Sequence, residues 1–226
     1  MDWQAIFLSL RLATLTTALL LVAGTPLAYW LAFSPRRWKF AVEAVVALPL
    51  VLPPTVLGFY VLIAIGPRSP IGALYGRLFG GTLPFSFGGL LVGSLLYSLP
   101  FTVQPVTAAF GGVDRRLIEA ARCLGASPWK TFIRVVAPLS RGGIGTGAIL
   151  TFAHTVGEFG VVLMVGGNLA GITRTVSISI YDDVQALDYR AAMHTSLLLL
   201  GISFLVLAAT YGLRRRVWAV WPPYGE

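Results

Sequence analysis

Few residues in this sequence could do chemistry, and most of them lie in apolar surroundings. Glu158 is the single charged residue between positions 142 and 173, and His154 lies one helical turn before it. A carboxylate in such surroundings is costly unless it faces a cavity or a hydrogen-bonding interior. We therefore interpret Glu158 as an interior hydrogen-bonding residue with a structural or a gating role.

Catalytic and metal chemistry have weak support in the sequence. Ser94 and His154 are a conceivable nucleophile and base of an intramembrane hydrolase, but no motif orients the histidine. His154 and His194 lack the spacing of metal ligands. The chain also lacks the GxxxxGK[ST] phosphate loop of an ATPase. We predict that it has no catalytic residue, no metal site and no cofactor of its own.

The elements that must position these residues are membrane spans. The chain has 226 residues, of which 56% are hydrophobic and 12% are charged, about half the usual charged share. Residues 12–35, 44–67, 78–113 and 191–213 contain no Asp, Glu, Lys or Arg. Because about 20 apolar residues cross a bilayer as a helix, the pattern predicts an integral membrane protein. A soluble enzyme, a disulfide scaffold and a disordered tail are excluded.

The hydropathy pattern predicts an all-α polytopic bundle that forms one transmembrane domain over residues 1–226. Five spans are expected, over residues 5–33, 40–65, 88–110, 142–166 and 194–213. A short interfacial helix is expected over residues 71–79, and a broken or re-entrant segment near 174–187 would make six membrane pieces. Two small-xxx-small pairs, Gly89 with Gly93 and Gly143 with Gly147, are typical of closely packed membrane helices.

The second span is unusually rich in proline. It contains Pro49, Pro53 and Pro54 within six residues. Each proline frees a backbone carbonyl, which is tolerated at membrane depth only where protein or water satisfies it. Interrupted helices often mark transport pathways, so a pathway and a simple kink both remain open for this cluster.

The net charge of +8 mostly encodes orientation. Twelve of the seventeen basic residues fall in three segments that lie on one side of the predicted membrane. These segments contain Arg36, Arg37 and Lys39, then Arg115, Arg116, Arg122, Lys130, Arg134 and Arg141, and finally Arg214, Arg215 and Arg216. The positive-inside rule makes that side cytoplasmic, with the N-terminus outside and the C-terminus inside. Nucleic-acid binding is therefore an unneeded hypothesis.

The cytoplasmic loop, residues 111–141, is predicted to form two short helices. Asp114 is a good N-cap for the first helix, and Gly125 is a typical residue just after its end. Ser127 and Pro128 begin the second helix, which Pro138 is expected to end. The expected apolar faces consist of Leu117, Ala120, Ala121 and Leu124, then Trp129, Phe132, Ile133 and Val136. An interfacial hairpin and a docking element are both compatible with this pattern.

Glu119-Ala120-Ala121, followed by Gly125 and later Pro138, resembles the EAA motif of ABC importer permeases. Val135 and Ala137 are mild departures from the Ile and Leu usual in that motif. The segments LPLVLPPTVLGFYVL (48–62) and VGEFGVVLMVGGNLAGITRTVSISIYDDVQALDY (156–189) are similar to molybdate importer permeases. Leu169 and Ala170 depart from that family's usual residues, which leaves tungstate and sulfate open.

This resemblance implies a type I ABC importer permease fold and a set of partners. It implies two cytoplasmic ATPase subunits that bind ATP and Mg, an extracytoplasmic oxyanion-binding protein, and a permease homodimer in the cytoplasmic membrane. It assigns ATPase coupling to Glu119, Ala120, Ala121, Gly125, Ser127, Trp129 and Pro138. A secondary transporter is the more remote alternative, because it would need no cytoplasmic docking helix.

A tetrahedral oxyanion is best held by hydroxyls, backbone N–H groups and arginine. Thr55 and the run Thr173-Arg174-Thr175 supply such groups. Arg174 could attract an anion or anchor an interfacial segment. We predict a translocation pathway or gate formed by Pro53, Pro54, Thr55, Glu158, Gly160, Thr173, Arg174 and Thr175.

Overall fold

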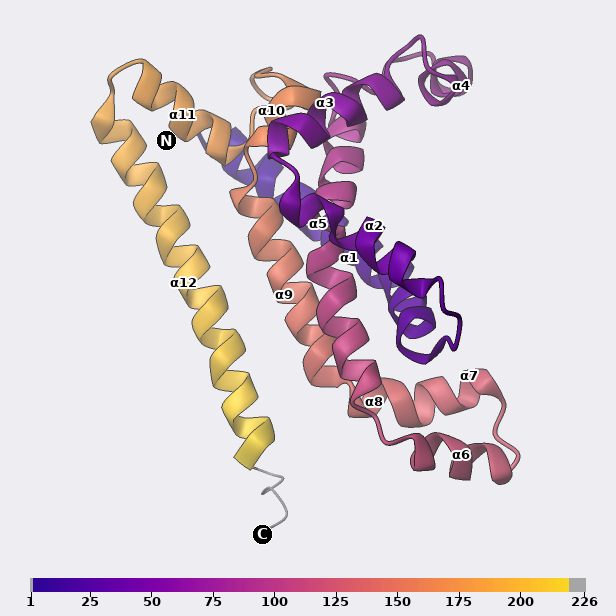
Figure 1. Cartoon of the computed structure of the whole chain (residues 1–226). Coiled ribbons are helices and arrows are strands. Elements are labelled where there is room, and N and C mark those ends of the chain that lie inside the picture. The colour runs from indigo at the N-terminus through magenta and orange to yellow at the C-terminus, as the bar shows by residue number, and fades with distance from the viewer. Residues whose placement is uncertain (1, 220–226) are drawn as a thin grey trace.

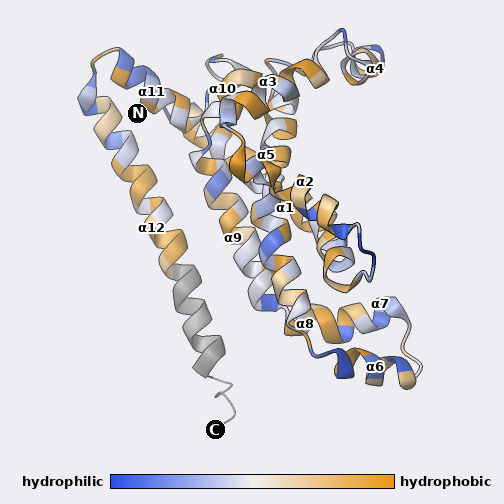
Figure 2. Ribbon diagram, viewed as in Figure 1, coloured by the Kyte–Doolittle hydropathy of each residue, from blue (hydrophilic) through white to orange (hydrophobic). Residues whose placement is uncertain are grey.

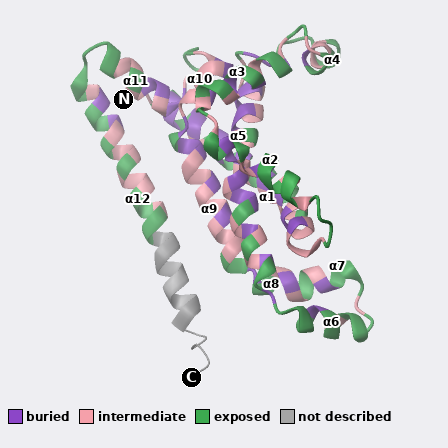
Figure 3. Ribbon diagram, in the orientation of Figure 1, coloured by how far each residue is buried: buried purple, intermediate pink, exposed green. Residues whose placement is uncertain are grey.

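The computed structural model describes the backbone of residues 2–219 and the side chains of residues 2–208. Three helices form its centre, namely α1 (Trp3–Phe33), α5 (Phe87–Gly111) and α9 (Arg141–Gly157), which pack against one another (Figure 1). Buried residues concentrate on these helices, and exposed residues dominate the periphery (Figure 3). All regular elements in the described backbone are helical, as the hydropathy pattern predicts.

The helices agree with the expected spans except at two breaks. The second span is divided into α2 (Lys39–Val51) and α3 (Pro54–Ile65), which are bent by 115°. The fourth is divided into α9 and α10 (Gly160–Gly166), bent by 60°. Within the described residues, three helices are long and apolar enough to cross a membrane, or five if each bent pair is one span. Counting each bent pair as one span agrees with the five expected spans, and the break at the double proline is the interruption that the sequence left open against a simple kink.

Proline chemistry explains the first break. Pro53 has φ −54° and ψ 134°, outside the helical region, and Pro54 begins α3 as its first residue. A proline cannot donate to the preceding turn, and it disfavours a helical conformation in the residue before it. Pro49 lies inside α2, which nevertheless continues to Val51. The double proline, and not Pro49, is thus the element that divides this span.

The remaining helices lie at the edges of the bundle. A helix, α4 (Pro70–Phe79), is present where the sequence predicts a short interfacial helix, and the segment near 174–187 forms α11 (Val176–Gln185). Helix α12 (Tyr189–Ala219) runs beside the bundle, and its basic residues Arg214, Arg215 and Arg216 lie beyond the described side chains (Figure 1). The end of α12 points to the same end of the molecule as α6, whereas the N-terminus lies at the other end.

The loop between α5 and α9 forms an arm of four short helical pieces. These are α6 (Arg115–Cys123), α7 (Pro128–Thr131), the π-helical η1 (Phe132–Val136) and α8 (Ala137–Leu139). Hydrophilic residues are dense along α6 and in the turn between α1 and α2 (Figure 2). We call residues 111–141 the cytoplasmic arm, after the side on which the sequence places it.

The capping predictions for the arm are confirmed. Asp114 accepts from the Arg116 N–H at 2.9 Å, and Ser127 accepts from the Lys130 N–H at 3.3 Å. Gly125 has φ +80°, and the N–H of Ala126 donates to the Ala121 carbonyl at 3.0 Å, which is a Schellman ending. A residue with a Cβ is disfavoured at that φ, which explains the glycine.

Two expectations for the arm were wrong. Pro138 does not end the second helix, because the missing N–H is accommodated by the π-turn of η1 and the helix continues to Leu139. In the first helix the buried residue is Ile118, whereas Leu117 and Leu124 are exposed. The apolar stripe therefore does not simply mark the face that packs on the bundle.

Close packing of α9 on α5 generates the first prediction. A Cβ on Gly143 would overlap the Cβ of Ala109 and lie 3.1 Å from the Pro105 carbonyl, whereas a Cβ on Gly145 would meet nothing within 4 Å. We expect Gly143→Ala to destabilise the fold by about 1–3 kcal/mol through overpacking. Gly145→Ala on the same helix is the control, with stability equal to the parent or higher by up to about 1 kcal/mol. Thermal unfolding in detergent measures both, and equal melting temperatures would contradict this packing.

Candidate functional site

An open pocket of about 600 Å³ lies where the two broken spans meet. Four of the residues predicted for the pathway line it, namely Pro54, Thr55, Glu158 and Gly160. Its other lining residues are Tyr97, Ala153, His154, Gly157, Phe159, Leu163 and Met164. The pocket therefore combines hydroxyl, imidazole and carboxyl groups with apolar walls.

The two breaks create this pocket. Helix α9 ends at Gly157, and Glu158 is extended with φ −67° and ψ 137°, so the chain turns before α10 begins. Helix α10 then packs on α3, with Pro54 and Gly160 both on the pocket wall. Pro53 is exposed and is not among the lining residues. Breaking a helix at this depth exposes backbone and side-chain groups to the pocket in place of lipid.

Glu158 is buried, with 4% of its surface exposed. Its Oε2 accepts a hydrogen bond from the Ser94 hydroxyl at 3.0 Å, whereas Oε1 has no hydrogen-bond partner among the described residues. The acid thus joins α5 to the break between α9 and α10. This placement fits the interior hydrogen-bonding residue expected from the sequence.

Ser94 and Glu158 form the first rung of a polar ladder between α5 and α9. Ser98 Oγ lies 3.1 Å from His154 Nδ1 and 2.9 Å from Thr155 Oγ1, and it forms a hydrogen bond with each. One turn further along, the hydroxyls of Thr102 and Thr151 also form a hydrogen bond. We use the name polar ladder for Ser94, Ser98, Thr102, Thr151, His154, Thr155 and Glu158.

The hydrolase pairing of Ser94 with His154 is absent from this geometry. Ser94 contacts the carboxylate of Glu158, and the serine beside His154 is Ser98. Ser98 is fully buried and is already bonded to Thr155. The ring of His154 stacks on Phe101 with centroids 3.9 Å apart, which fits a packed histidine.

Most residues of the polar ladder were not predicted as site residues from the sequence. Ser94, Ser98 and Thr102 recur every four residues in a span without charges, and Thr151 and Thr155 repeat the same spacing. That spacing places hydroxyls on one face of each helix, and it was the signal that could have found them. Tyr97 and Phe101, which flank His154, carried no comparable pattern.

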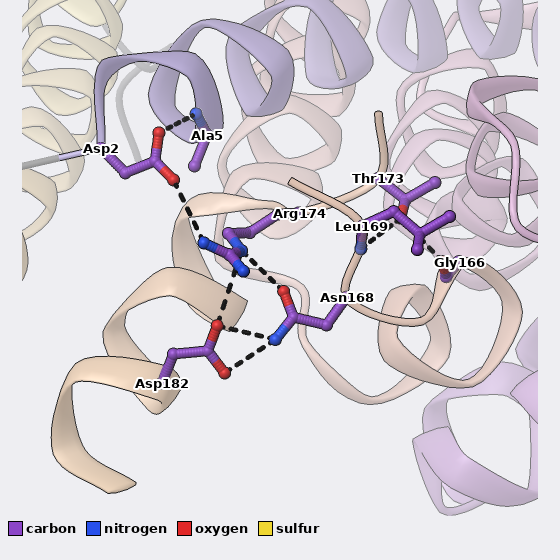
Figure 4. Close-up of polar contacts among 8 residues, drawn as sticks. All are labelled: Asp2, Ala5, Gly166, Asn168, Leu169, Thr173, Arg174 and Asp182. Atoms are coloured by element: carbon purple, nitrogen blue, oxygen red, sulfur yellow. Dashed lines mark hydrogen bonds and ion pairs between the residues drawn. The ribbon is translucent and has the colours of Figure 1, made fainter. Parts of the chain in front are cut away.

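Of the other predicted pathway residues, Thr173 and Arg174 lie in a separate group of polar contacts (Figure 4). The Nε of Arg174 donates to Asn168 Oδ1 at 2.7 Å and lies 3.5 Å from Asp182 Oδ2, and its second ion pair joins Asp2 at 3.9 Å. Asn168 also donates to Asp182. This network ties the start of α1 to α11 and the loop before it, so Arg174 anchors the end of the bundle at which α1 begins.

The threonines beside Arg174 are both buried in the fold. Thr173 is fully buried, donates to the Gly166 carbonyl at 2.7 Å and accepts from the Leu169 N–H at 3.1 Å. Thr175 is buried at the start of α11, and no partner of its hydroxyl is found among the described residues. The structure does not place these three residues on the pocket with Glu158.

The residues predicted for ATPase coupling lie on the cytoplasmic arm, mostly exposed. Trp129 is 68% exposed, and Glu119, Ala120, Gly125, Ser127 and Pro138 are exposed as well, whereas Ala121 is half-buried. Exposed apolar residues on the arm are Leu117, Leu124, Trp129, Ile133 and Leu139. Basic side chains are interleaved with them along the sequence. Such a surface suits a protein partner.

An aromatic cluster joins the cytoplasmic arm to the central helices. Phe132 of η1 packs against Tyr29 of α1 and Phe110 of α5, with ring centroids 5.5 and 6.0 Å apart. Ile118 and Val136 are buried in the same cluster. We call Tyr29, Phe110 and Phe132 the aromatic junction. The arm therefore packs directly on α1 and α5.

Comparison with known proteins agrees with this arrangement. A sequence model of the family "Binding-protein-dependent transport system inner membrane component" matches residues 24–218. The molybdenum transport system permease protein ModB of Azotobacter vinelandii is 58% identical over 95% of this chain and 95% of its own. The protein of that name from Escherichia coli K12 is 37% identical over 81% of this chain and 80% of its own.

A solved structure shows the same fold. The inward-facing MetNI methionine ABC transporter contains a chain that superposes with a TM-score of 0.74. The superposition covers 96% of each chain at 19% identity. It supports the expected type I importer permease fold for this helix arrangement.

The polar ladder generates the second prediction. Ser94→Ala removes the hydrogen bond to Glu158 Oε2 and leaves a buried carboxyl group without a partner, so we expect a loss of about 1–3 kcal/mol in stability. Glu158→Gln keeps an oxygen that can accept from Ser94, and its loss should be smaller. Thr14→Ala is the control, because that hydroxyl is exposed and donates within its own helix. Thermal unfolding measures all three, and a Ser94→Ala protein as stable as Thr14→Ala would contradict the ladder.

Proposed function

The chain belongs to the family of binding-protein-dependent transport system inner membrane components, and on this premise we propose that it is the permease subunit of an ATP-driven ABC importer for molybdate. The 58% identity to the Azotobacter vinelandii molybdenum permease, over 95% of both chains, carries the substrate assignment. Tungstate and sulfate, which are also tetrahedral dianions, are the alternatives. The protein then works as a multi-pass component of the cytoplasmic membrane, with its N-terminus outside.

The energy for import comes from partner subunits. The sequence has no GxxxxGK[ST] phosphate loop, so two cytoplasmic ATPase subunits bind ATP and Mg in this proposal. The cytoplasmic arm docks on an ATPase through its exposed apolar residues and the flanking basic side chains. Closure of the two ATPases pulls on the arm, and the aromatic junction passes this movement to α1 and α5.

Transport follows from alternating access around the pocket. One chain supplies an open pocket, and two copies around a two-fold axis would together enclose a path for the anion. The arm's movement changes which end of that path is open. An extracytoplasmic oxyanion-binding protein delivers the anion at the end that carries Arg174, Asp182 and α11. Selection rests mainly with that protein, and Thr55 and His154 offer the anion transient contacts on the pocket wall.

Uptake with competition tests the substrate. Cells that express the permease with its ATPase and binding protein are supplied with labelled molybdate and an excess of unlabelled molybdate, tungstate or sulfate. We expect ATP-dependent molybdate uptake that tungstate inhibits and sulfate does not, because sulfate is the smaller anion. Uptake of sulfate in preference to molybdate, or no uptake of either, would contradict the assignment.

Two matched tryptophan variants test whether the cytoplasmic arm couples the permease to the ATPase. Trp129→Ala removes an exposed ring from the arm, and Trp3→Ala removes a ring of nearly equal exposure, 67% against 68%, from the opposite end. We expect Trp129→Ala to lower transport-coupled ATP hydrolysis about tenfold, the loss typical of a buried tryptophan at an interface. Trp3→Ala should leave it unchanged. Equal rates for the two variants in reconstituted complexes would refute docking at Trp129.

A further inference from the structure

Arg11, on the exposed side of α1, has no acidic partner among the described residues. Arg11 lies eight residues after Trp3, which is about 12 Å along an α-helix. Its guanidinium carbon lies 4.6 Å from the centroid of the Phe87 ring, and its side chain is exposed. The ion pairs among the described residues do not include it. A cation at this depth in a membrane requires an anion or a route to the headgroups.

A pocket of about 410 Å³ surrounds this arginine. It lies where the first turns of α1 meet the start of α5 and the loop after α10, and it is lined by Gln4, Phe7, Leu8, Arg11, Phe87, Gly171 and Ile172. Gln4 and Arg11 are seven residues apart, so they lie on one face of the helix. The amide and the guanidinium supply hydrogen-bond donors, whereas the other side chains that line the pocket are apolar.

The exposed face of α1 continues from this pocket towards the middle of the helix. The exposed residues recur at helical spacing and comprise Trp3, Gln4, Phe7, Arg11, Thr14, Leu15, Ala18, Leu19 and Val22. Phe7 is 71% exposed and Val22 is 76% exposed. Beyond Arg11 this face carries no charge. A cationic group near one end, followed by an apolar stripe, matches a headgroup followed by an acyl chain.

We propose that this groove binds an anionic phospholipid. The phosphate lies between Arg11 and Gln4, because a guanidinium forms strong hydrogen bonds with phosphate oxygens. One acyl chain follows Leu15, Leu19 and Val22 along α1. The apolar walls favour a lipid over a free oxyanion. Neither Arg11 nor Gln4 lines the pocket that contains Glu158, so the groove is separate from the proposed path.

Native mass spectrometry of the permease–ATPase complex in detergent tests this site with phosphatidylglycerol as the probe. Arg11→Gln is expected to weaken lipid binding roughly tenfold, the loss of one charge-assisted hydrogen bond. Arg11→Lys should retain part of the affinity because it keeps the charge. Arg77→Gln, which removes an exposed arginine on α4, is the matched control and should bind like the parent. Equal lipid binding by Arg11→Gln and Arg77→Gln would overturn the proposal.

Two further measurements on the same complex identify what occupies the groove. Molybdate or inorganic phosphate at millimolar concentration should leave phosphatidylglycerol bound, and displacement by either would make the groove a site for free oxyanions. A parent complex that retains no lipid would overturn the proposal and would mean that another surface, such as a second copy of the chain, covers α1. Should Arg11→Gln fail to assemble, Gln4→Glu places a negative charge beside the phosphate and is expected to weaken binding. Unchanged binding by Gln4→Glu would also overturn the site.

Discussion

Polar groups between α5 and α9 must satisfy one another, because the surrounding hydrocarbon offers them no hydrogen bonds. Ser94, Ser98 and Thr102 lie at successive turns of α5, and each forms a hydrogen bond with a residue of α9 or with Glu158, which directly follows it. Each of these bonds restricts how far the two helices can slide along or rotate against each other. A slide by one residue would break all rungs together. The glycine contact at Gly143 depends on the same register, since it brings α9 against Ala109. The polar ladder thus fixes the frame on which the rest of the bundle is built.

This frame leads directly from the cytoplasmic arm to the interior pocket. Ser140, between α8 and α9, donates to the Ala109 carbonyl of α5 at 3.3 Å, so the arm is tied to both helices where it joins them. Phe132 ties it to α1 as well. At its other end α9 reaches the pocket at Gly157 and Glu158. The arm is therefore connected to α1, α5 and α9, and α9 runs from the arm to the pocket.

The sequence allowed prediction of those features that local chemistry controls. The long charge-free stretches predicted α1, α5 and α12, and cap residues such as Asp114 and Ser127 predicted where the helices of the arm begin. The pairing of Ser94 with Glu158 could not be predicted, because it joins residues 64 positions apart. The grouping of Thr173, Arg174 and Thr175 with the pocket failed for a related reason. The hydroxyl and guanidinium donors of these residues suggested an anion site. In the structure, however, the Arg174 guanidinium is already bound by Asn168, Asp182 and Asp2.

The breaks at Pro53 and Glu158 are where the two bent spans change direction. Helices α3 and α10 pack on each other and on α5, and the chain passes from α9 to α10 through Glu158 and Phe159. The ladder holds α9 to α5 up to Glu158 and stops there. Glu158 Oε1 has no hydrogen-bond partner among the described residues, whereas Oε2 accepts from Ser94 and would lose that bond if the break rotated. Beyond Glu158, apolar contacts of α10 and α3 with α5 therefore take over from the polar ladder, and both kinds of contact hold the wall of the pocket.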